Sequence, residues 1–343
     1  MPELVWPNGR PMRRSDLTRE IAGPTVTGVR QVVSGHPAQG LTPGRLAALL
    51  REAEEGDPTR YLELAEEMEE KDLHYRSVLA TRKLQVSQLE ITVEPASDAK
   101  EDVANAALVE GFLERDELQE ELCDILDAVG KGFSVTEIVW ETSERQWMPA
   151  RLEWRFPQWF QFDRRDGRTP LLRGDAGPES LLPYKFVLHI HKSKSGLPIR
   201  GGLARAAAWC YLFKNYDIKD WVAFAEVYGQ PLRVGKYHPG ATEGDRKTLL
   251  KAVANIGSDA AAIIPSSMLI EFVKADQTGS VDLYERLAEY LDKQTSKAVL
   301  GQTLTTEVKE GSRAAAQVHD GVRDDIERSD AHQLAASLNR DLV

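Results

Sequence analysis

The sequence predicts an α+β protein in which a mixed body is followed by two long helices with a small α/β insert between them. The first observation is an uninterrupted run from Leu203 to Tyr228, which follows a Gly/Pro-rich start signal and ends at Gly229-Gln230-Pro231. The second is a set of alternating segments on either side of this run. As a helix, the run is about 39 Å long, well beyond the usual length of about 11–12 residues.

The first half of the chain reads mainly as helices. Residues 1–40 are rich in Pro, Gly and Arg and lack periodicity, which indicates an arm that wraps around the body or waits for a partner. Thr42-Pro43 and Asp57-Pro58 are helix-start signals. Helices are therefore expected over 43–55, 61–71, 73–86, 100–113 and 118–129, with alternating strands over Leu89–Glu94 and Phe133–Trp140.

The segment from 147 to 192 reads as β-structure, with Asp166-Gly167 as a hairpin turn. Strands are predicted over 147–156, 159–163 and 186–192, and later over 232–237, 260–264 and 269–273. Further helices are predicted over 245–255 and 281–300. A polar, Thr-rich loop over 301–311 then leads into a helix from Ser312 that reaches Val343 without a stop signal, so we expect the natural domain to continue.

The aromatic residues of the first long helix form two stripes. Trp209, Phe213 and Tyr216 recur at i, i+4 and i+7, whereas Trp221, Phe224 and Tyr228 recur at i, i+3 and i+7. The five-residue step between the stripes rotates the apolar face by about 140°. The helix is therefore expected either to kink near its centre or to contact two different partners. Helical spacing favours packing over stacking on nucleic-acid bases.

Composition limits the possible functions. A net charge of −11 argues against a protein that grips nucleic acid through bulk positive charge, but it is compatible with a lumen through which DNA slides. The two cysteines, Cys123 and Cys210, lack metal-ligand spacing and are interpreted as reduced thiols. The N-terminus lacks the apolar segment of a signal peptide, and no apolar run is long enough to cross a bilayer.

The sequence offers no catalytic or cofactor-binding motif of a known kind. Gly130-Lys131-Gly132 lacks the spacing of a phosphate-binding loop, and GxSxG is absent. His189 and His191 share one face of a predicted strand and are the best metal candidates, but spacing suggests no third ligand, so a structural role is preferred. The acidic run from Glu66 to Asp72 is interpreted as a solvated helix face. No catalytic, cofactor or metal residue is predicted.

Several segments resemble the portal proteins of Mu-like phages and prophages. They include HIHKSKSGLPIRGGLARAAAWCYLFKNYDIKDWVAFAEVYGQPLRVGKY at 189–237, AAAII at 260–264 with Ile270-Glu271, and VLGQTLTT at 299–306. VLATRKLQV at 78–86 and GKGFSVTEIVW at 130–140 fit the same family. The resemblance covers nearly the whole chain.

The resemblance implies a ring of about twelve subunits at one capsid vertex, with double-stranded DNA passing through it without sequence specificity. The protein would be non-enzymatic and without cofactors, and it would reside in the virion after assembly in the host cytoplasm. Its partners would be further copies of itself, the terminase large subunit, and capsid and head–tail connector proteins, with no membrane. The ring would serve as the channel for genome packaging and ejection.

The family plan assigns each part of the chain a place. It implies an N-terminal arm (1–40), a wing (41–200), a first stem helix (201–228), a clip (229–279), a second stem helix (280–300), a tunnel loop (301–311) and a wing/crown helix (312–343) with the crown truncated. The two aromatic stripes would pack the stem. Channel residues in or beside the loop would be Thr303, Thr305, Thr306, Glu307, Lys309 and Glu310.

Two alternatives remain at this point. One is a metal-dependent enzyme built around His189 and His191, which metal analysis of the purified protein would detect. The other is a monomeric helical adaptor, which sedimentation or mass photometry would distinguish from a ring.

Overall fold

The computed structural model describes the backbone of residues 5, 9, 11–32, 35–143, 146–229, 233–254, 261–265, 280–303 and 313–343. Side chains are described for the same residues except 227–229, 233–235, 252–254, 261–265, 280–281 and 313–320. The chain divides into two compact units, one formed by Met1–Leu212 with Asp292–Val343 and the other by Phe213–Leu291. The observed elements confirm the predicted α+β class.

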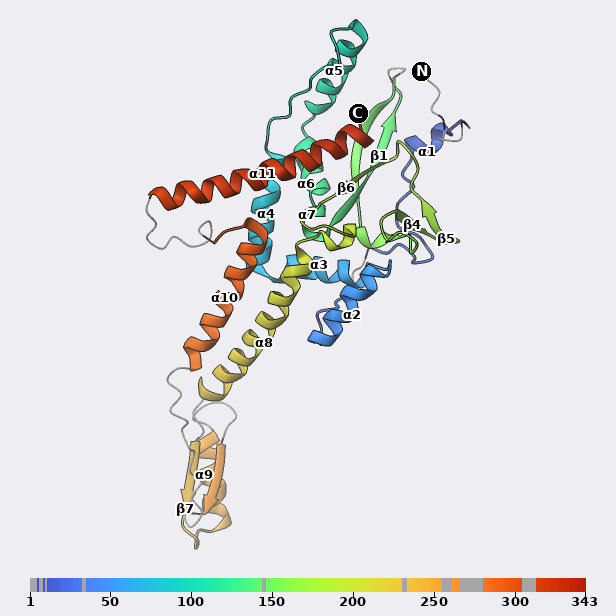
Figure 1. Ribbon diagram of the computed structural model, residues 1–343. Helices are drawn as coiled ribbons and strands as arrows, with labels where there is room; N and C mark the ends of the chain where they lie inside the picture. The colour runs from blue at the N-terminus through green and yellow to red at the C-terminus, as the bar shows by residue number, and fades with distance from the viewer. Residues whose placement is uncertain are drawn as a thin grey trace. The chain divides into compact units, whose positions relative to one another are not determined.

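Helices dominate the start of the first unit (Figure 1). The Thr42 hydroxyl caps its helix by accepting a hydrogen bond from the backbone N–H of Arg45, as the sequence predicts. The short α1 was not predicted, and the helix expected over 118–129 is divided into two. The bounds are α1 Arg14–Thr18, α2 Pro43–Glu54, α3 Thr59–Lys71, α4 Leu73–Ser87, α5 Lys100–Leu113, α6 Leu118–Ile125 and α7 Ala128–Lys131.

Gly132 forms the joint between α7 and the main sheet. Its φ of +100° lies in the left-handed region, and a Cβ at this position would come within 2.6 Å of the Pro198 carbonyl oxygen. Only glycine fits this close backbone approach. Gly132 therefore allows β1 (Phe133–Glu141) to begin in close contact with the loop that precedes α8 (Ala204–Gly229).

Two three-stranded antiparallel sheets form the β part of the first unit. In the main sheet, β1 lies between β2 (Met148–Arg155) and β6 (Phe186–Ile190), and most of β1 is buried. The second sheet has the order β3-β4-β5, with bounds Phe160–Phe162, Pro170–Gly174 and Gly177–Ser180. The Asp166 carboxylate shapes the β3–β4 turn by accepting bonds from the backbone N–H groups of Arg168 and Thr169.

The strand predicted over Leu89–Glu94 is wrong. These residues follow α4 without strand pairing, and both Leu89 and Ile91 are exposed. Alternation signals a segment able to form a strand, but a strand also needs a neighbour, and none of the described strands pairs with this one.

The elements from α8 to α10 follow one another in the predicted order. After α8 come β7 (Arg233–Tyr237), α9 (Glu243–Ala254) and β8 (Ala261–Pro265), and then α10 (Ser280–Leu300). β7 and β8 pair in parallel, with α9 as the connecting helix. The strand predicted over 269–273 lies outside the described residues.

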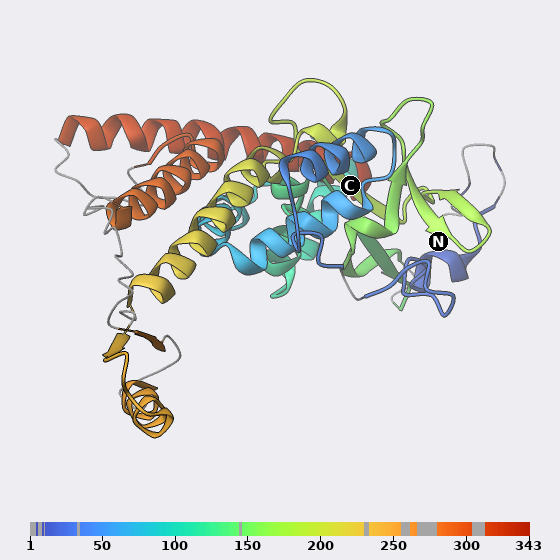
Figure 2. The same cartoon turned by 90° about the horizontal axis from the view of Figure 1, so that it is seen from below.

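The last helix closes the first unit. α11 (Arg313–Asp341) runs along β6 (Figure 1). Elsewhere in the same unit, the blue helices α2 and α3 lie side by side in both views (Figures 1 and 2). Leu334 and Leu338 of α11 join the core that surrounds β1. Within the described ranges, no helix has both the length and the apolar character required to span a bilayer.

Candidate functional site

The first long helix, α8, buries different faces in its two halves. In its first half, Ala204, Ala207 and Tyr211 are buried. In its second half, Trp221 stacks on Tyr284 of α10 with ring centroids 6.4 Å apart, and Phe224 lies against the same ring at 5.9 Å. The two halves of α8 therefore make their contacts through different faces, and α8 is one helix throughout. The face buried in the first half is not the predicted aromatic stripe, and packing of the two stripes in a stem stays a prediction.

The first aromatic stripe of α8 remains on the surface. We call Trp209, Phe213 and Tyr216 the α8 stripe; their exposed fractions are 36%, 44% and 36%. Large aromatic side chains lower the free energy by about 2–3 kcal/mol when they leave water. A periodic row of them on one helix face is typical of a surface that packs against another protein.

A second exposed row lies on α10 and was missed by the sequence analysis. Leu283, Leu287 and Tyr290, the α10 stripe, are 64%, 40% and 56% exposed. Their spacing of i, i+4 and i+7 is the same as that of the α8 stripe. The signal was therefore present in the sequence, but periodicity alone does not separate a buried apolar face from an exposed one.

Most of the predicted channel residues lie outside the described part of the chain. Thr303 is described and half-buried, whereas Thr305, Thr306, Glu307, Lys309 and Glu310 are not described. The backbone of Tyr228 belongs to α8, but its side chain is likewise not described.

The two histidines form part of a buried polar layer beneath α11. His189 and His191 are each 1% exposed, and His189 Nδ1 lies 2.9 Å from the Ser337 hydroxyl. Burial lowers the pKa of each histidine to about 4; the charge of the other imidazole adds to the effect at His189, and Asp330 opposes it at both. Both imidazoles are therefore neutral at pH 7.

Asp330 is a candidate for a third metal ligand, because its Oδ1 lies 3.7 Å from His191 Nδ1. However, Arg82 already binds this carboxylate through two nitrogens, at 2.7 and 3.0 Å. Among the described residues, no group of three or more His, Cys, Asp or Glu side chains is arranged to hold a metal ion. The Asp330 carboxylate is therefore already committed to a guanidinium, and the structural role of the two histidines stays a prediction.

Arg82 connects three helices. Its guanidinium binds Asp330 of α11 and also donates to the backbone carbonyl of Val299 in α10 at 2.6 Å. Arg82 and Asp330 are 8% and 1% exposed. Bidentate pairing in a desolvated setting fixes geometry strongly, so this pair sets the positions of α4, α11 and the last turn of α10 within the first unit.

The edge of the main sheet is protected by α11. The Leu188 N–H donates to the Asp341 carboxylate at 2.8 Å, and the Leu188 carbonyl accepts a bond from Arg340. Just beyond the strand, the Lys192 N–H donates to Gln333 at 2.7 Å. These side chains satisfy backbone groups on the outer side of β6, which would otherwise offer a template for pairing with another chain.

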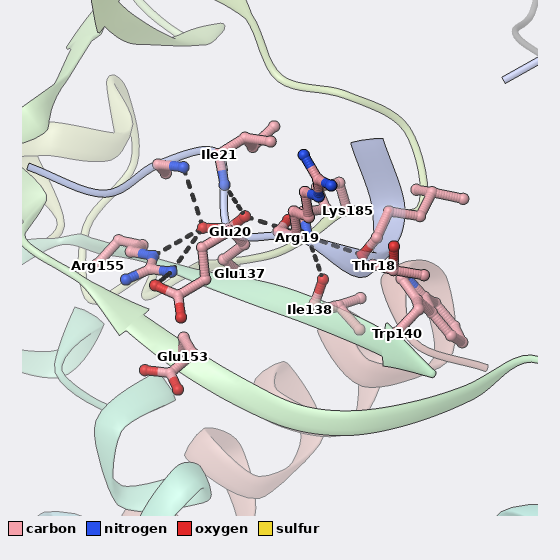
Figure 3. Close-up of polar contacts among 12 residues, drawn as sticks. Thr18, Arg19, Glu20, Ile21, Glu137, Ile138, Trp140, Glu153, Arg155 and Lys185 are labelled. Carbon is pink, nitrogen blue, oxygen red and sulfur yellow. Dashed lines mark hydrogen bonds and ion pairs between the residues drawn. The ribbon is translucent and has the colours of Figure 1, made fainter. Parts of the chain in front are cut away.

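The expected N-terminal arm is partly bound to the body (Figure 3). Both Glu137 and Lys185 are fully buried, 3.2 Å apart. Glu137 accepts bonds from the backbone N–H groups of Ile21 and Ala22 at 2.6 and 3.1 Å. Lys185 donates to carbonyls of the same segment and of Ile138 at 2.6 to 2.9 Å. The body thus recognises the backbone around residues 17–22.

The lysine between two glycines is not a phosphate site. Lys131 is 2% exposed, lies 2.6 Å from Asp127 and also pairs with Glu66. Burial alone would lower the pKa of Lys131, but Asp127 and nearby glutamates outweigh it and raise the pKa. The ammonium is therefore already committed to carboxylates.

The interpretation of the acidic run as a solvated face was wrong. Glu67 is 3% exposed and accepts the backbone N–H of Ala38, while Asp72 is 7% exposed and caps α4. Burial raises the pKa of Glu69 to about 7. Of this run, Glu70 is exposed. The sequence of an acidic run does not reveal which of its carboxylates will be buried against a cation, a backbone N–H group or a helix N-terminus.

Comparison with known proteins identifies the family. The family model described as the portal protein of Mu bacteriophage matches residues 62–343. The Mu-like prophage FluMu protein gp29 of Haemophilus influenzae is 40% identical over 318 residues, and the portal protein of Escherichia phage Mu is 39% identical over 313 residues. Each alignment covers 90% of this chain and 61% of the relative, so the chain spans about three-fifths of the length of these relatives.

The family match begins within α3 and extends to the last residue, so it includes both long helices, the β7–α9–β8 insert and the polar layer beneath α11. The chain belongs to the family of Mu bacteriophage portal proteins.

Proposed function

We propose that this chain is a portal subunit, which forms a ring of about twelve copies at a capsid vertex. The ring acts as the channel for genome packaging and ejection, and as the docking site for the terminase large subunit and head–tail connector proteins. Duplex DNA passes through without sequence recognition, which suits a chain with a net charge of −11. The subunit is a structural component and performs no chemistry; it assembles in the host cytoplasm and resides in the virion.

The order of elements supports an assignment of parts. We assign 1–40 to the N-terminal arm, 41–200 to the wing, 201–228 and 280–300 to the two stem helices, and 229–279 to the clip. The tunnel loop is 301–311, and 312–343 is the wing/crown helix. The parallel β7–α9–β8 unit between α8 and α10 is the observation that supports the clip.

The exposed stripes of α8 and α10 carry the proposal that copies of the chain associate. Both long helices keep a large apolar row on the surface, although other faces of the same helices are buried. In a ring, each subunit uses two different surfaces, one for each neighbour. The α8 stripe and the α10 stripe supply two such surfaces. A monomeric adaptor would instead leave both apolar rows exposed to water, which lowers solubility.

The first test changes one stripe residue. Phe213→Ser and Leu287→Ser are each expected to weaken assembly at least tenfold, because loss of one well-packed apolar side chain costs about 1.4 kcal/mol or more per interface. Mass photometry and negative-stain images of the full chain measure ring formation. The monomer should lose no more than about 0.5 kcal/mol of unfolding free energy, since both side chains are exposed.

Val222→Ser is the matched control. Val222 is 54% exposed on α8 but lies about 180° around the helix from Phe213. Rings that persist in Phe213→Ser and Leu287→Ser, or that fail equally in Val222→Ser, would contradict the assignment of the stripes. A wild-type chain that stays monomeric at all concentrations would contradict the ring itself.

A second test concerns the proposed tunnel loop. Lys309→Glu is expected to reduce DNA retention after packaging without affecting ring formation, because it replaces a phosphate-binding cation by a repelling charge. Retention is measured as the fraction of nuclease-protected DNA in filled heads at low and high salt. The difference between the variant and the wild type should shrink as salt rises. Equal retention at low salt would argue against a channel role for Lys309.

A further inference from the structure

The segment that follows α4 is built like a strand but pairs with nothing in the described chain. Leu89, Ile91 and Val93 alternate with Glu90, Thr92 and Glu94. Within the described residues, the backbone of residues 90–95 takes part in no backbone hydrogen bond. Leu89 and Ile91 are 39% and 40% exposed. Ile, Val and Thr favour extended backbone, so the segment is suited to adding to another strand.

This segment forms one wall of a groove of about 760 Å³. Other lining residues belong to the end of α5, the loop that follows it, and α6. The apolar lining residues are Leu89, Ile91, Leu113, Leu118 and Leu122. On the other side of Leu89, a second groove of about 480 Å³ leads to Ala331 and Ala335 of α11. Apolar lining residues beside a segment whose backbone groups are free within the described chain provide the two kinds of contact that peptide capture by strand addition requires.

The rim of the larger groove is acidic. Glu90, Glu110, Glu114 and Asp116 line it and are all exposed. The basic lining residue, Arg115, is already engaged, because it pairs with Glu121 and its guanidinium lies 4.1 Å from the centre of the Phe112 ring. The groove therefore carries net negative charge that no lining residue offsets. This charge excludes nucleic acid and favours a cationic polypeptide.

We infer that this groove is a docking site for an extended polypeptide segment of a partner protein, in which apolar side chains alternate with basic ones. The partner segment adds as a strand to residues 90–94. Its apolar side chains contact Leu89 and Ile91, and its basic side chains face Glu90 and the carboxylates of α5. This docking site is separate from the stripes of α8 and α10 and does not depend on ring formation.

The test uses a fluorescent octapeptide of alternating valine and lysine, with a valine–glutamate octapeptide as the control. Binding to the full chain is measured by fluorescence anisotropy. The lysine peptide should bind at least tenfold more tightly than the glutamate peptide, and its affinity should fall as salt rises. Glu90→Lys should weaken binding about tenfold, whereas Glu101→Lys, an exposed change on α5 outside the groove, should leave it unchanged.

Two proline variants test strand addition itself. Successive backbone N–H groups of a strand point to opposite sides, so a partner strand bonds with only one of the two sets. Proline removes one backbone N–H, and within the described chain no N–H of residues 90–95 is used in a backbone hydrogen bond. Thr92→Pro and Val93→Pro should therefore differ, one losing binding about tenfold and the other retaining it.

Four results would overturn the inference. They are no binding of the lysine peptide at millimolar concentration, equal binding of both peptides, equal effects of the two proline variants, and unchanged binding in Glu90→Lys. A fifth result would overturn the proposed partner. If Glu90→Lys abolishes self-association measured by mass photometry, the groove is occupied by a second copy of this chain.

Discussion

Arg82→Met is expected to lower the free energy of unfolding by about 3–5 kcal/mol, the largest effect of any single change considered for this chain. The substitution leaves the carboxylate of Asp330 buried without its bidentate partner, and leaves the Val299 carbonyl without its 2.6 Å donor. Methionine keeps much of the side-chain volume, so the loss reports the polar contacts rather than a cavity. Denaturant unfolding of the full chain at pH 7 measures it.

Two companion variants isolate the cause. Arg60→Met removes an exposed pair, Arg60 with Glu52, and should cost no more than about 1 kcal/mol. Arg82→Met combined with Asp330→Leu removes both charges, so it should recover at least half of the loss, because no unpaired charge remains. A cost below about 1 kcal/mol for Arg82→Met alone, or no recovery in the double variant, would show that the pair does not hold the three helices together.

The second large effect is a loss of stability in mild acid. His189 and His191 have folded-state pKa values lowered to about 4, against 6.5 when unfolded. Between these values the unfolded chain binds more protons, so the stability these groups contribute is present above pH 6.5 and lost as pH falls towards 4. From pH 7 to pH 5 the loss is about 2 kcal/mol per histidine.

Glu69 acts in the opposite direction. Its folded-state pKa is raised to about 7 from 4.5, so its contribution grows as pH falls through 7 and partly offsets the histidines. The experiment therefore compares the wild type with the double variant His189→Gln/His191→Gln. The stability difference between pH 7 and pH 5 should be smaller in the variant by about 3–4 kcal/mol.

The same comparison between pH 7 and pH 9, where these two histidines are mostly neutral in both states, serves as the internal control and should give a difference below about 0.5 kcal/mol. An equal acid response in the wild type and the double variant would show that the two imidazoles are not held neutral beneath α11.

Local sequence signals located most of the elements. Thr42 caps α2, the alternation from Phe133 marks β1, and the breakers around Gly229 mark the end of α8, because capping, pleat and φ restrictions act over a few residues. The rotation between the two aromatic stripes of α8 also follows from spacing alone. The sequence resemblance to Mu-like portal proteins led to the family that the comparisons confirm.

Other features depend on neighbours that are distant in the chain. The run from Glu66 to Asp72 looks uniformly solvated, yet Glu67 and Asp72 are buried because a backbone N–H from Ala38 and the start of α4 reach them. The partner of Arg82 lies 248 residues away, and no pattern in either segment points to the other. The α10 stripe has the spacing of a core face but remains exposed.

The sequence by itself determined which segments could form helices and strands, which family the chain belongs to, and where the apolar faces of α8 lie. The tertiary structure alone decided which of these faces is covered, which carboxylates are desolvated, and that Leu89–Glu94 has no strand beside it. The physical reason is that periodicity and capping are properties of a local backbone. Burial, ion pairing and strand pairing each need a second surface, which only the folded chain supplies.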